Sequence, residues 1–118
     1  MTWYLTIRSD AAHARFTATT ALVEFLCGLP ELRPTSPIGF ESETWRPWVA
    51  VLLAVSSPAG DYVSDGAYPP EVNVVELACS HSFDAWWYES LAGRIAEFLG
   101  WSAFEEHEGR RVWPPAVS

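Results

Sequence analysis

The chain has 118 residues, of which 49% are apolar, and a formal charge of −8 at neutral pH. This length predicts one domain with one ordinary core, and the composition excludes a disordered chain. The acidic balance disfavours nucleic acid and anionic lipid as partners and favours a basic partner or a cationic ligand. A charge of this size also serves solubility in small domains, so charge alone identifies no binding site.

The first ten residues, MTWYLTIRSD, lack the basic and apolar regions of a secretory signal. The longest apolar run, WVAVLLAV at 48–55, is far shorter than the ~20 residues that cross a bilayer. We therefore expect a cytoplasmic protein without membrane contact, in which Cys27 and Cys79 are reduced. Both cysteines are interpreted as small buried apolar residues, and their spacing predicts neither a metal site nor a cofactor.

Residues 2–8, TWYLTIR, alternate in side-chain type and include strong strand formers, which predicts a first strand. After a connector, the period changes to 3.6 from about Thr17, which predicts a helix that ends at Gly28 and Pro30. The apolar positions of this helix share one face: Leu22, Phe25, Leu26 and Leu29.

Residues 30–47 contain four prolines and little periodicity, which predicts a long surface loop with a short strand at 38–41. The run WVAVLLAVS at 48–56 is apolar at nearly every position. Such a run is typical of a strand near the centre of a sheet and covered on both faces. Residues 71–80, EVNVVELACS, are expected to form a second strand that pairs antiparallel with it.

The segment 82–100 has the clearest helical pattern, with Ser82 or Asp84 as its cap and Gly100 as its end. Residues 101–113 predict two short strands about a turn at 108–109. The buried face of the helix is expected to contain Trp87, Leu91, Ile95 and Phe98, with Tyr88 and Leu99 beside them.

These elements follow the order β-α-β-β-α-β-β. We therefore expect a single α+β domain over residues 1–118, with an antiparallel sheet of about four to five strands. Both helices are predicted to pack on one face of that sheet.

The stretch AGDYVSDGAYPPEV, residues 59–72, invites comparison with a calcium-binding loop. Asp61, Asp65 and Gly66 fit positions 1, 5 and 6 of an EF-hand loop. Val63 and Val72 stand where two further ligands are required, so turn chemistry explains the Asp–Gly pairs better.

Two other groups were weighed as catalytic sites. Cys79 and His81 lie two apart on a predicted strand, which places them on one face about 6–7 Å apart, too far for an activated nucleophile pair. The carboxylates of 105–108 lie near a predicted turn, where they are expected to be solvated. We therefore predict no catalytic residue.

Acidic and aromatic residues gather between positions 41 and 76, where six acidic residues face one basic residue, Arg46. Long loops stiffened by proline are often functional, acids steer a basic partner, and aromatic rings anchor it. We expect a preorganised binding loop at 59–70, joined by 40–46; a functionless hairpin connection is the alternative. The predicted partner-binding residues are Glu41, Glu43, Trp45, Asp61, Tyr62, Asp65, Tyr68 and Glu71.

The helix end RIAEFLGW, the following SAFEEHEGRRVW, and the stretch WVAVLLAVSSPAGDYVSDGAYPPEVNVVEL carry a resemblance over residues 40–115. In these segments the chain resembles small acidic bacterial immunity proteins encoded beside polymorphic toxins, including Rhs and type VI secretion effectors. The resemblance implies stoichiometric binding to a cognate, basic toxin domain whose active site is blocked. It implies no catalytic residue.

Two other functions stay open at this stage. One is a small enzyme or small-molecule-binding protein with a site between the sheet and loop 30–47, using Glu41, Glu43 or Cys79. The other is a structural homodimer joined through strand edges, although we expect a monomer or a weak homodimer in the free protein.

Overall fold

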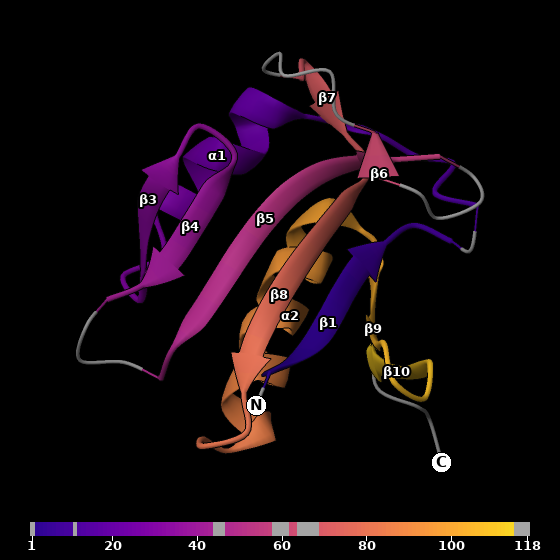
Figure 1. Cartoon of the computed structure of the whole chain (residues 1–118). Coiled ribbons are helices and arrows are strands. Elements are labelled where there is room, and N and C mark those ends of the chain that lie inside the picture. Colours follow the sequence, from indigo (N-terminus) through magenta and orange to yellow (C-terminus); the bar gives the residue numbers. More distant parts are fainter. Residues whose placement is uncertain (1, 11, 44–46, 58–61, 64–68, 115–118) are drawn as a thin grey trace.

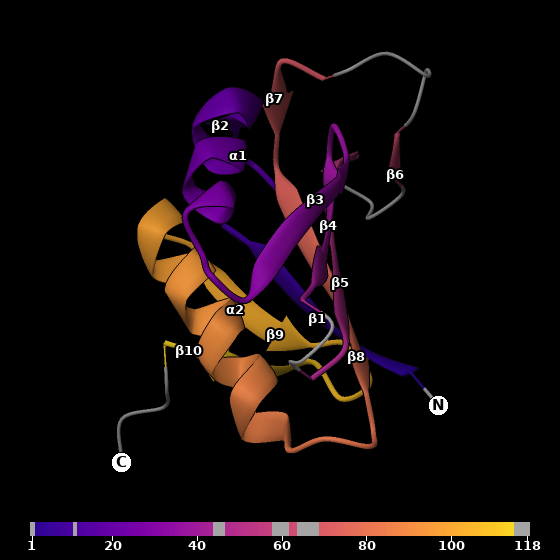
Figure 2. The same cartoon turned by 90° about the vertical axis from the view of Figure 1, so that its left-hand side faces the viewer.

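A computed structural model describes residues 2–10, 12–43, 47–57, 62–63 and 69–114. Seven strands form an antiparallel sheet in the order β10-β9-β1-β8-β5-β4-β3, and β6 pairs separately with β5. Two further strands, β2 and β7, form a small antiparallel sheet of their own. Helices α1 and α2 both lie on one face of the large sheet (Figures 1 and 2).

The strands of the large sheet are β1 (Thr2–Arg8), β3 (Leu32–Ser36), β4 (Gly39–Ser42), β5 (Val49–Ser56), β6 (Tyr62–Val63), β8 (Val74–Ser80), β9 (Ser102–Glu105) and β10 (Arg110–Trp113). The small sheet consists of β2 (Thr17–Ala18) and β7 (Glu71–Val72), and the helices are α1 (Thr19–Cys27) and α2 (Ala85–Leu99). Within these described ranges, neither helix combines the length and the apolar character of a membrane span.

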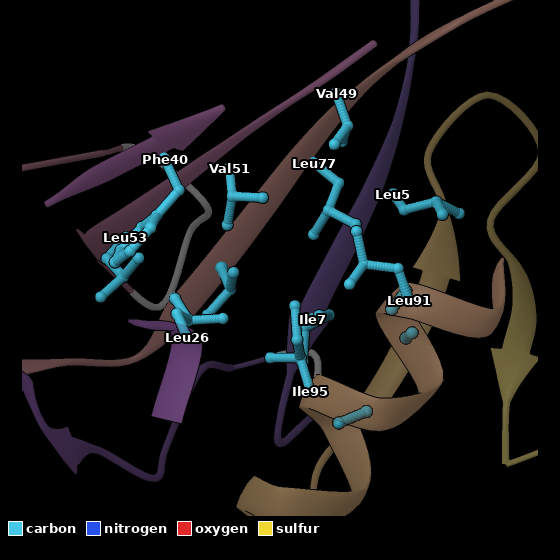
Figure 3. Close-up of a cluster of buried hydrophobic side chains, with 14 of the residues drawn as sticks. Leu5, Ile7, Leu26, Phe40, Val49, Val51, Leu53, Leu77, Leu91 and Ile95 are labelled. Carbon is cyan, nitrogen blue, oxygen red and sulfur yellow. The ribbon is translucent and has the colours of Figure 1, made fainter. Parts of the chain in front are cut away.

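The predicted α+β class, the two helices and their shared face are confirmed, whereas the sheet has more strands than the expected four to five. Alternation explains its inner face. The register aligns Leu5 with Leu77, Leu77 with Val51, and Val51 with Phe40, in a row across four strands. All four side chains are buried, and Figure 3 shows them in one cluster with side chains of α1 and α2.

The short strand predicted at 38–41 is confirmed as β4, but the loop prediction is wrong at 32–36, where β3 pairs antiparallel with β4 and extends the sheet. Proline made this segment resemble a loop. Pro34 lies on β3, the outermost strand, where a missing backbone N–H is tolerated because one strand edge has no partner.

Strand β5 lies beside the central strand β8, as expected, but it is covered on one face and not on both. Val49, Val51 and Leu53 are buried under the helices, whereas Leu52 on the opposite face is 40% exposed. Its flanking neighbours on the outer face are alanines, which expose little apolar area and need no covering layer.

The buried face of α2 includes Leu91, Ile95 and Tyr88 as predicted, but it also includes Ala92, Gly93 and Ala96, while Trp87 is only partly buried. Phe98 is 48% exposed and stacks on Phe25 of α1, with ring centroids 4.1 Å apart. Gly93 is buried, and a Cβ at this position would lie 2.9 Å from the Trp113 ring. Gly100 ends the helix in the left-handed conformation, φ 70°, as the sequence predicts.

Asn73 hydrogen-bonds the two ends of the segment that joins β5 to β8. Its side chain is buried: Oδ1 accepts a hydrogen bond from the Ser56 N–H at 2.7 Å, and Nδ2 donates to the Ser56 carbonyl at 2.8 Å. Nδ2 also donates to the carbonyl of His13 at 3.0 Å. The amide therefore replaces strand-to-strand bonds where β7 ends and β8 begins.

Replacing Asn73 with alanine is expected to lower the free energy of unfolding by about 2–4 kcal/mol, because buried backbone groups lose their partners. Urea unfolding followed by tryptophan fluorescence measures this change. Thr20→Ala, at an exposed position of α1, is the control and should stay within about 0.5 kcal/mol of the parent. Equal stability of the two variants would contradict the role of Asn73.

Candidate functional site: an acidic and aromatic cleft

Most of the predicted partner-binding residues lie where the structure gives no side-chain description. Trp45, Asp61, Asp65 and Tyr68 are outside the described residues, as is most of the stretch 59–72 that was compared with a calcium-binding loop. Tyr62 is described only as backbone, at the start of β6. Side chains are described for the other three: Glu41, Glu43 and Glu71.

These three glutamates do not lie together. Glu41 pairs with Ala50 at the start of β5, and Glu43 follows directly after β4. Glu71 belongs to β7, close to the far end of β5 (Figure 1). At about 3.3 Å per residue the two ends of β5 are more than ~20 Å apart. The acidic segments at 41–43 and 71 are thus separate surfaces.

A different acidic surface forms at the start of β1. Strand β9 pairs with β1 at Leu5–Arg8, so that Thr2, Trp3 and Tyr4 of β1 continue past its end. The turn between β9 and β10 passes beside them, and the Glu106 N–H donates to the Tyr4 carbonyl at 3.2 Å. Together with the start of α2, these segments enclose a cleft of about 800 Å³. We name it the β1 cleft.

Three aromatic side chains line the β1 cleft: Trp3, Tyr4 and Phe83. Trp3 packs edge-on against the buried Tyr88, with centroids 5.6 Å apart, and lies 6.3 Å from the His81 ring. The Tyr88 hydroxyl donates to the Trp48 carbonyl at 2.6 Å and accepts from the Ser80 N–H at 3.3 Å. Tyr88 thereby holds the start of α2 against β5 and β8, and its ring supports that of Trp3.

Four carboxylates also line the β1 cleft, and three of them help to build it. Glu105 accepts hydrogen bonds from the backbone N–H groups of His107 and Glu108, which shapes the turn. Glu106 accepts a hydrogen bond from the Thr6 hydroxyl, and Glu89 forms an ion pair with Arg110 at 3.0 Å. Against these four carboxylates stands one arginine, so the lining is negatively charged.

The chemistry of this lining suits the binding of a cation. Carboxylates attract positive charge, and aromatic faces attract it through their quadrupole. No group of three or more His, Cys, Asp or Glu side chains within the described ranges is arranged to hold a metal ion.

The site expected between the sheet and loop 30–47 does not coincide with the β1 cleft. The hairpin β3–β4 is part of the sheet, and none of residues 30–43 or 47 lines the cleft. Cys79 is fully buried, and burial raises its pKa from 9.0 to about 12. At neutral pH this thiol is therefore protonated and a poor nucleophile.

Comparison of the chain with protein-family models, with curated proteins and with solved structures finds no match in any of the three.

Sequence reasoning missed the β1 cleft because its walls come from three distant segments, 2–4, 81–89 and 105–110. The glutamates of 105–108 were expected to be solvated, and Glu106 and Glu108 are indeed exposed, but the fold also brings them into one cleft with aromatic side chains. One signal was available: Phe83 stands among polar residues just before the helix cap, where no buried position is required, and it is 45% exposed.

The two cysteines are expected to differ strongly in alkylation rate. At pH 8 a thiol with a pKa of about 12 is ionised in about one molecule in 10⁴. Exposed Cys27 should therefore react with iodoacetamide at least about 100-fold faster than Cys79, as measured by peptide mass spectrometry. In urea both should react, which controls for chemical accessibility. Rapid labelling of Cys79 in the folded protein would contradict its burial.

Proposed function

We propose that this protein is a cytoplasmic immunity protein that binds a cognate secreted toxin and neutralises it by blocking the toxin's active site. The observation that carries the proposal is the β1 cleft, in which carboxylates stand beside exposed aromatic rings on a molecule of charge −8. The resemblance over residues 40–115 to immunity proteins of polymorphic toxin systems supports it from the sequence.

The mechanism is occlusion, and no bond is made or broken. Toxins that act on nucleic acids or nucleotides need basic clefts to hold phosphates, and carboxylates can take the place of those phosphates. Long-range attraction between opposite charges raises the association rate, and aromatic side chains then supply contact area.

The acidic segment at 59–70 is a second part of this proposed surface, and its C-terminal end at Pro69 and Pro70 is hydrogen-bonded to α1. Thr19 at the start of α1 binds the C-terminal end, since its Oγ1 donates to the Pro69 carbonyl at 2.6 Å and its N–H to the Pro70 carbonyl at 3.0 Å. Pairing of β6 with β5 and the Asn73 side chain hold the rest of the base. Fixed ends lower the entropy cost of ordering a loop on binding.

A small-molecule-binding protein is the second candidate function. It is favoured by the size of the β1 cleft, about 800 Å³, which falls in the range typical of small-ligand sites. The gene neighbourhood separates the two: a large multidomain toxin gene immediately upstream favours immunity, whereas a metabolic operon favours a small ligand.

Co-expression with the toxin domain encoded by the neighbouring gene tests the proposal directly. We expect a stable one-to-one complex on affinity purification and size-exclusion chromatography, and loss of toxin activity at equimolar ratio. An active toxin that does not co-purify would contradict the function.

The double substitution Asp61→Lys with Asp65→Lys is expected to slow association with the toxin about tenfold while changing dissociation less, because loop charges act mainly on diffusional encounter. Biolayer interferometry measures both rates, and circular dichroism checks folding. Glu24→Lys with Glu97→Lys makes the same change in net charge on exposed helix positions and is the matched control. Equal association rates for the parent and the loop variant would remove the loop from the interface.

A further inference from the structure

The negative charge of the β1 cleft is concentrated on one turn. Arg110 offsets Glu89, but the other three carboxylates of the cleft form no ion pair with any described residue. These three carboxylates lie within the four residues 105–108. Their negative charges repel one another, and a bound cation would reduce that repulsion. The three are Glu105, Glu106 and Glu108.

The aromatic residues that line the cleft favour a flat cation over a spherical one. Tyr4 and Phe83 are 39% and 45% exposed, so their rings are available for contact. A guanidinium stacks on an aromatic ring and binds a carboxylate through two parallel N–H groups, whereas an ammonium is a strongly hydrated point charge. Rings and carboxylates side by side thus match the two recognition modes of arginine.

The protein already uses both modes with its own arginines. The Cζ atom of Arg8 lies 4.1 Å from the centroid of the Phe104 ring. Arg94 binds both carboxylate oxygens of Glu31, at 3.3 and 2.6 Å. In the β1 cleft itself, Arg110 holds Glu89 at the margin.

The cleft is larger than one guanidinium needs. Its volume of about 800 Å³ accommodates a whole side chain with adjoining backbone, and Thr2–Tyr4 run along it beyond the end of β9. We propose that the β1 cleft receives an arginine side chain of a protein partner, with the guanidinium between the aromatic side chains of the lining and the turn at 105–108. The identity of that partner as a toxin rests on the proposed function; the arginine specificity does not.

The probe is the tripeptide amide acetyl-Gly-Arg-Gly, titrated into the isotope-labelled full chain and followed by two-dimensional amide NMR. We expect saturable shifts of the Trp3 indole N–H and of the backbone amides of Phe83, Glu106 and Glu108. The citrulline tripeptide, which is neutral and nearly isosteric, should bind at least about fivefold more weakly, since it lacks the charge. The lysine tripeptide should also bind more weakly.

Glu106→Gln with Glu108→Gln should weaken binding of the arginine tripeptide at least about fivefold. Glutamine keeps an oxygen that can accept from Thr6, so the turn is expected to stay folded. Glu24→Gln with Glu97→Gln changes the net charge equally at exposed helix positions and should leave affinity unchanged. Equal losses in both variants, shifts spread over the whole acidic surface, or equal affinity for citrulline or lysine would overturn the proposal.

The outcomes separate this inference from the proposed function. If the tripeptide binds in the β1 cleft but the neighbouring toxin does not co-purify, the arginine site stands and the immunity function fails. If the toxin co-purifies while the tripeptide does not bind, the immunity function stands and the arginine site fails.

Discussion

One-sided burial is the constraint on which the rest of this structure depends. The row Leu5, Leu77, Val51 and Phe40 gives the sheet one strongly apolar face, and both helices must cover it. The longer helix, α2, packs over β1 and the C-terminal hairpin, so its first turn lies near the beginning of β1 (Figure 1). The β1 cleft follows from this docking, because three chain segments meet there without filling the space between them.

The charged residues of the β1 cleft lie apart from the apolar core that stabilises the fold. The turn at 105–108 carries its carboxylates at the end of a hairpin, away from the buried row. Two of these carboxylates, Glu105 and Glu106, accept hydrogen bonds that hold the turn in place. Repulsion among the carboxylates of Glu105, Glu106 and Glu108 is therefore confined to a short turn that faces solvent. The negative charge of this turn creates a local field that favours cations, and it lies away from the core.

Local patterns were enough to predict the helices, the central strands and the last hairpin, since each has a clear period and a recognisable end. They failed where tertiary position decides. Pro34 is compatible with a strand because β3 is outermost, and Phe98 stacks on Phe25 of α1 at the surface instead of entering the core. The β1 cleft could not be predicted, because no local pattern brings residues 2–4 beside 105–110.

The glycine at position 93 ties the two ends of this architecture together. Trp113 of β10 rests directly on it, and a methyl group there would approach the ring to 2.9 Å. Because Gly93 has no side chain, the Trp113 ring packs directly on the backbone of α2, and this contact sets the distance between the helix and the final hairpin. Since that hairpin also carries the turn at 105–108, Gly93 sets how closely this side of the β1 cleft approaches α2, although Gly93 itself does not line the cleft.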